Sequence, residues 1–103
     1  PHYVAILAVR GTLPPTELQV KLVDTTGANV WWWRLQPHVF TPTTALVHLR
    51  RASLAFAWGP ASGGDPSRLA AVEVALAADD GRQGSIWIEA FRIEPRAENP
   101  SQQ

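Results

Sequence analysis

The stretch Leu18-Gln19-Val20-Lys21-Leu22-Val23 decides the fold. Leu18, Val20 and Leu22 occupy every second position of it, with Gln19 and Lys21 between them. Successive side chains of a β-strand point to opposite faces, so the three apolar residues share one face. The stretch is therefore predicted to be a strand with one buried face.

The same period of two recurs along the chain. It is found in Tyr3–Val9, Val30–Leu35, Leu46–Arg50, Leu54–Trp58, Val72–Ala77 and Ile86–Ile93. Turn-forming residues separate these runs, at Thr26-Gly27, Asp80-Gly81, Gln83-Gly84 and in a long loop from Gly59 to Pro66. About seven short strands punctuated by turns predict an all-β fold, an antiparallel β-sandwich of the jelly-roll type.

Two segments depart from simple alternation. Leu69–Ala78 is rich in alanine, and a helix capped by Ser67 is the alternative there, although alternating valines favour a strand. Within Ile86–Ile93 the apolar residues change parity halfway. A β-bulge near Glu89-Ala90 would let both halves face the core.

Length and composition indicate one domain. The chain has 103 residues, of which 46% are hydrophobic, enough for a single buried core. We expect residues 1–94 to form the β-sandwich module. The polar, proline-containing segment 95–103 is expected to be a tail or linker.

Charge and composition exclude several classes of function. Nine basic and nine acidic residues cancel, and the basic residues are scattered, which argues against nucleic-acid binding. No run approaches the ~18 apolar residues that membrane insertion requires. The absence of cysteine excludes disulfides and thiolate sites.

The chain contains five tryptophans, a large number for its length. Trp31, Trp32 and Trp33 are consecutive, so in a strand Trp32 lies on one face and its two neighbours on the other. One core cannot hold all three, and at least one indole must lie on the other side of the sheet. Trp58 and Trp87 lie in apolar alternating runs, and we expect both in the core.

An outward indole predicts sugar binding, because its electron-rich face stacks on the C–H groups of a sugar ring while polar neighbours bind the hydroxyls. The candidate carbohydrate-binding residues are Trp31, Trp32, Trp33, Arg34, Asn29 and Gln36. The alternative is a structural or protein-interaction β-sandwich whose tryptophans pack internally or against a neighbouring domain. The sequence does not identify the glycan.

Four stretches in this order carry a resemblance to a known family: Leu18–Asp24, Asn29–Trp32, Ala55–Pro60 with Gly63-Gly64, and Gly84–Ile88. They resemble the galactose-binding-like jelly-roll modules of bacterial discoidin-type (coagulation factor 5/8 type C-like) proteins, over about Tyr3 to Glu94. The resemblance implies a two-sheet sandwich that binds a polysaccharide or oligosaccharide. It also implies a secreted or cell-surface bacterial protein, often with a catalytic domain in the same parent chain.

The sequence departs from that family pattern at two places. Such modules carry further strands upstream of the point where this sequence begins, and without them a sheet edge is open. We therefore expect homo-oligomers through an open edge. The modules also tend to have paired aspartates after the Trp-Ile step, where this chain has Glu89-Ala90, so the residues do not support a calcium site.

Catalytic and metal-binding residues are not predicted. Glycosidic hydrolysis needs two carboxylates across a cleft, and the acidic residues here are dispersed along the chain. His2, His38 and His48 lack the spacing of a metal motif. We therefore expect a binding protein without cofactor rather than an enzyme. A small metal-dependent jelly-roll enzyme acting on polysaccharide is the third hypothesis.

Overall fold

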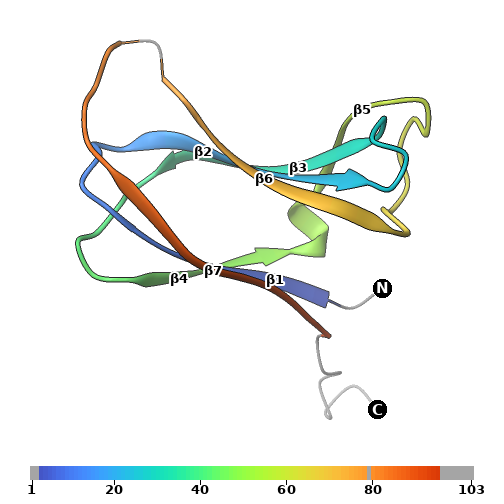
Figure 1. Cartoon of the computed structure of the whole chain (residues 1–103), viewed down its shortest axis with the longest axis horizontal. Helices are drawn as coiled ribbons and strands as arrows, with labels where there is room; N and C mark the ends of the chain where they lie inside the picture. The colour runs from blue at the N-terminus through green and yellow to red at the C-terminus, as the bar shows by residue number, and fades with distance from the viewer. Residues whose placement is uncertain (1–2, 79, 96–103) are drawn as a thin grey trace.

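Seven β-strands form two antiparallel sheets packed face to face, in a computed structural model that describes residues 3–78 and 80–95 (Figure 1). The elements are β1 (Tyr3–Gly11), β2 (Thr16–Asp24), β3 (Val30–His38), β4 (Ala45–Arg50), the 3-10 turn η1 (Arg51–Ser53), β5 (Ala55–Trp58), β6 (Leu69–Ala77) and β7 (Ile86–Pro95). One sheet has the strand order β4-β1-β7, and the other β5-β3-β2-β6. The predicted all-β sandwich is confirmed. Over the residues that the structure describes, no helix is long and apolar enough to cross a membrane.

The core lies between the two sheets, and β2 supplies one wall of it. Leu18, Val20 and Leu22 are fully buried. They form one hydrophobic cluster with Leu7 and Val9 of β1 in the facing sheet. Burying one such side chain stabilises the fold by about 1.5–3 kcal/mol, so these contacts hold the sheets together.

The alanine-rich segment is a strand, β6, and not a helix. It pairs antiparallel with β2, so that Val72 lies opposite Leu22, and Leu76 lies opposite Leu18. The apolar residues of both strands therefore share the inner face. Alternation decided the conformation here against the helix propensity of alanine, because β2 offers both backbone pairing and an apolar face.

The predicted bulge in the last strand is confirmed. Along β1, Ala8 pairs with Ala90 and the next residue, Val9, pairs with Ile88, so that Glu89 is the extra residue. The bulge shifts the parity of β7 and places Ile88 and Phe91 on the same inner face. β7 continues to Pro95, one residue beyond the predicted end of the module. The rest of the predicted tail, residues 96–103, lies outside the described residues.

Candidate functional site

The three consecutive tryptophans of β3 divide between the two faces of the sheet, as alternation predicts. Trp31 and Trp33 point inward and are 3% and 2% exposed. Trp31 Nε1 donates a hydrogen bond of 2.7 Å to the carbonyl oxygen of Gly64, and Trp33 Nε1 donates one of 2.8 Å to that of Arg50. Both rings belong to the core, which leaves Trp32 as the outward member.

Asn29 also lies inside the protein, although the sequence predicts it beside a bound sugar. Its side chain is buried. Its Nδ2 donates to Asp24 Oδ2 at 2.7 Å, and its Oδ1 accepts a hydrogen bond of 2.7 Å from the backbone N–H of Ala61. Asn29 thus ties the β2–β3 turn to the loop after β5. Of the six candidate residues, Trp32, Arg34 and Gln36 remain on the surface.

The prediction that Trp58 lies in the core is wrong, because a register shift turns it outward. Trp58 is 49% exposed. In β5, Phe56 pairs with the inward Trp31, but Trp58 pairs with Val30 across an irregularity. The shift puts Trp58 on the outer face of the four-stranded sheet, where its ring meets that of Trp32 edge to face at 5.6 Å and 84°.

Two cations lie over these outer rings. The guanidinium carbon of Arg34 is 5.0 Å from the centroid of Trp32, and the Nζ of Lys21 is 5.7 Å from that of Trp58. Lys21 is the direct cross-strand partner of Trp32 on β2. Cation–π contacts of this kind at an exposed site contribute about 0.5–1 kcal/mol each and hold the rings in position.

A carboxylate organises the polar half of this face. Glu17 accepts hydrogen bonds from Arg34 Nε at 2.9 Å, from Gln36 Nε2 at 2.8 Å and from Gln19 Nε2 at 2.6 Å. These donors, Arg34 first, lower the pKa of Glu17 from 4.5 to about 2. Within residues 3–78 and 80–95, the side-chain oxygens of Gln19 and Gln36 accept no hydrogen bond. We call this surface of Trp32, Trp58, Lys21, Arg34, Gln19, Gln36 and Glu17 the Trp32 face.

The three-stranded sheet carries a second exposed tryptophan, and here too the expectation of a core residue is wrong. Trp87 is 42% exposed because it pairs with Arg10 on the outer side of β1. The Arg10 guanidinium lies 4.2 Å from the Trp87 ring centroid. Glu89 accepts hydrogen bonds of 2.7 Å from Arg10 Nε and from the hydroxyl of Thr44. No pattern in the sequence indicates this cluster, because its members come from three separate segments.

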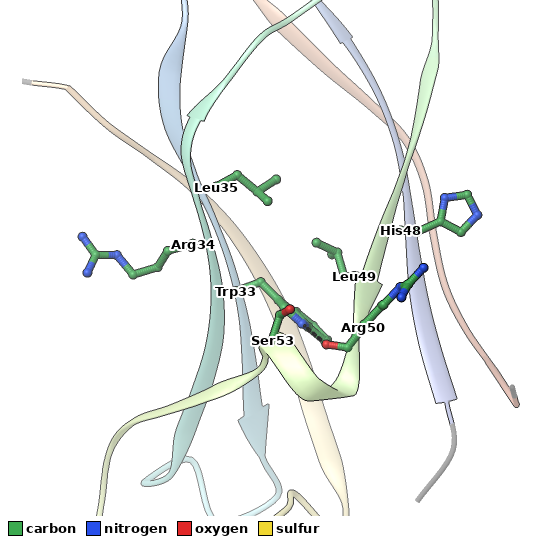
Figure 2. Close-up of a pocket in the computed structure, with 7 residues that line it drawn as sticks. All are labelled: Trp33, Arg34, Leu35, His48, Leu49, Arg50 and Ser53. Atoms are coloured by element: carbon green, nitrogen blue, oxygen red, sulfur yellow. Dashed lines mark hydrogen bonds between the residues drawn. The ribbon is translucent and has the colours of Figure 1, made fainter.

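A cavity of about 240 Å³ opens between β3 and β4, but its polar side chains do not converge. Figure 2 shows Leu35 and Leu49 pointing toward each other from opposite sheets, while Arg34 and His48 point away on opposite sides. The indole of Trp33 lies below them, bonded to the carbonyl of Arg50. The residues that line this cavity include no carboxylate, so it lacks the pair of carboxylates that glycoside hydrolysis needs.

Four carboxylates of the described residues are held in their charged form. Hydrogen bonds from neighbouring side chains lower the pKa values of Glu17, Asp24, Asp80 and Glu89. A general acid in glycoside hydrolysis needs the opposite, a raised pKa. Among the described residues, no group of three or more His, Cys, Asp and Glu side chains could hold a metal ion. His2 lies outside the described residues.

A search with this chain matches no protein-family model, no curated protein and no solved structure. The likeness to galactose-binding-like modules therefore stays a prediction.

Proposed function

We propose that this chain is a non-catalytic carbohydrate-binding module that holds an oligosaccharide, or a soluble polysaccharide, on the Trp32 face. The observation that carries the proposal is the indole pair of Trp58, which is 49% exposed, and Trp32, which is partly exposed, on one sheet among polar side chains with unused hydrogen-bonding capacity. The proposal includes a secreted or cell-surface location, where such glycans occur.

The rings are preorganised for stacking. Trp32 lies on β3, a strand paired on both sides along this stretch, and Trp58 braces it edge to face. Rings that are already fixed lose little conformational freedom when a ligand binds, so more of the stacking energy appears as affinity.

The angle between the rings selects the type of glycan. The planes of Trp32 and Trp58 are 84° apart, so the two rings form a corner and not a flat row. A corner fits the side and face of a single sugar or a flexible chain. A crystalline polymer surface such as cellulose needs coplanar rings, and it is therefore expected to bind weakly.

The polar neighbours supply both kinds of hydrogen-bonding group. The amide oxygens of Gln19 and Gln36 can accept from sugar hydroxyls, and Lys21 and Arg34 can donate to them. Glu17 fixes the orientation of three of these four side chains. The polar half of the face is thus ordered before any ligand arrives, as the aromatic half is.

The structural or protein-interaction sandwich remains the second candidate, since Trp31 and Trp33 do pack internally. It predicts no sugar binding and no effect of the outer rings on any polysaccharide. Binding measurements therefore separate the two candidates.

The test is affinity electrophoresis against a panel of soluble polysaccharides, with pull-down on insoluble ones. Trp32→Ala and Trp58→Ala are each expected to weaken binding about tenfold or more, the loss of roughly 1.4 kcal/mol of stacking. Trp87→Ala is the matched control, because it removes an indole that is 42% exposed, close to the 49% of Trp58, from the other sheet. It is expected to bind as the parent does, and circular dichroism checks that each variant is folded.

Binding to no glycan in the panel contradicts the proposal. So does an equal loss in the Trp87→Ala variant, which would mean that exposed tryptophans act without regard to their face.

A further inference from the structure

One side of the sandwich is closed and the opposite side is open. On the closed side β4 and β5 are joined by the short turn η1, and Leu49 and Leu54 beside it are buried. On the open side β6 and β7 are the edges of their sheets. A cavity of about 180 Å³ lined by both Leu69 of β6 and Ile93 of β7 puts these two edges next to each other.

Inward-facing side chains reach water on the open side. Register places Val72 and Leu76 of β6 on the buried face of β2, and Ile88 and Ile93 of β7 on the buried face of β1. Each of these four is nevertheless 37–42% exposed. Four strands face three, so the smaller sheet does not cover the whole inner face of the larger one.

The edge strand β6 carries few of the features that usually protect an edge, and its one register shift against β2 lies at its start, before Ala71. Its nine residues include no proline, no glycine and one charge, Glu73. Natural edge strands commonly avoid pairing through lysine, proline or bulges placed along the exposed side. The outer backbone N–H and C=O groups of β6 are thus available for another strand.

We infer that the open side binds a second copy of this chain, with β6 pairing antiparallel to β6 of that copy about a two-fold axis at Val74. In this register Val72 lies opposite Leu76 of the other copy, and Glu73 lies opposite Ala75. The two four-stranded sheets join into one of eight strands. This inference does not depend on the sugar-binding proposal.

The charge pattern of β6 favours a second copy of this chain as the partner that covers the open side. The single charge of β6 meets an alanine and not the other Glu73, so no like charges face each other across the pair. The two-fold axis also brings the exposed residues of both β7 strands toward each other, so each copy covers the open side of the other.

The area of the open side fits a weak dimer. In this register residues 71–77 pair, and seven residues at about 3.4 Å each span ~24 Å; two stacked sheets with their side chains are roughly 20 Å thick, which gives about 480 Å² per copy. The total of about 1,000 Å² lies below the standard size of stable interfaces, in the range of weak and transient complexes. We expect a dimer that dissociates on dilution.

Sedimentation equilibrium from about 1 μM to 1 mM tests the inference, with a pair of variants that read the register. Ala75→Glu puts a like charge opposite Glu73 twice in the dimer, and is expected to weaken association about fivefold. Ala75→Lys puts an opposite charge there and is expected to strengthen it by a similar factor. Because both variants change the same surface position, a general effect of substituting Ala75 would change the association of both by the same factor.

Hydrogen exchange supplies a second readout. The amides of β6 are expected to become better protected as concentration rises, whereas those of β4, an edge strand on the closed side, are expected to stay unchanged. A protein that stays monomeric up to about 1 mM overturns the inference. So does a dimer that Ala75→Glu and Ala75→Lys affect equally, or one that protects β4 instead of β6.

Discussion

Truncating Trp33 and Trp32 separately tests the assignment of faces on which the sugar-binding proposal depends. The two residues are neighbours of the same type on one strand and differ chiefly in which face they occupy. Trp33 is 2% exposed and belongs to the core cluster. It buries about 200 Å² of largely apolar surface, worth ~5 kcal/mol at 25 cal/mol per Å². Trp33→Ala is therefore expected to cost about 4–5 kcal/mol of unfolding free energy, within the usual range for a buried aromatic.

Trp32→Ala removes much less. The ring keeps part of its surface in water, and its main partners are the edge of Trp58 and the Arg34 guanidinium. One aromatic pair and one exposed cation–π contact are together worth about 1–2 kcal/mol. The two substitutions are thus expected to differ by about 3 kcal/mol.

Thermal and urea unfolding, followed by far-UV circular dichroism, measure this difference. In a domain of about 100 residues, 1 kcal/mol moves Tm by ~4–8 °C, so the Tm of Trp33→Ala should lie roughly 12–24 °C below that of Trp32→Ala. Equal losses of stability, or a larger loss at Trp32, would refute the division of the indoles between core and surface. The Trp32 face would then lose its basis.

Three further predictions follow from the described contacts. The pKa of Glu17 is lowered to about 2, so its contribution to stability is present above pH ~4.5 and is lost as pH falls toward 2; acid titration of Glu17→Gln should show a smaller loss than the parent. Acrylamide should quench part of the tryptophan emission, and replacing the three outward tryptophans by phenylalanine should remove the quenchable part. Gly59 and Gly63 share a φ of +132°, but an added Cβ at Gly59 lies 2.7 Å from Asn29 Cα and at Gly63 meets nothing within 4 Å. Gly59→Ala should therefore lower Tm more than Gly63→Ala.

The sequence predicts what depends on local alternation. The alternation of Leu18, Val20 and Leu22 with polar residues predicts that these three are buried, because the apolar face of a strand packs against the core. The opposite directions of Trp32 and its neighbours follow from the same geometry. Even the bulge in β7 can be predicted, because the change of parity between Ile88 and Phe91 has no other simple explanation in a strand.

Alternation fails where an irregularity belongs to the pairing and not to the sequence. Trp58 follows Phe56 by two positions, and alternation alone would place both on one face. The register shift between β3 and β5 separates them. It depends on how two strands distant in sequence meet, which no window along β5 contains.

Asn29 shows a second limit of prediction from sequence. Its residue type is common both in sugar sites and in turns. The contacts that assign it to a turn come from Asp24 on one side and Ala61 on the other. Polar residues near a predicted site are thus the weakest part of a sequence-based prediction, since their role depends on partners far along the chain.

The two proposals combine into a geometry that favours long soluble glycans. In an eight-stranded sheet, the two β3 strands are five spacings of ~4.8 Å apart, so their Trp32 faces lie about 24 Å from each other on the same side. Sheet twist of roughly 20° per strand turns them about 100° apart. A flat insoluble surface cannot meet both faces, but a flexible chain can wrap across them and gain avidity.

Ala75→Glu should therefore weaken binding to a long soluble polysaccharide more than binding to a short oligosaccharide, as measured by affinity electrophoresis and calorimetry. Equal weakening of both would show that Ala75 acts on the binding face itself and that pairing adds nothing to recognition.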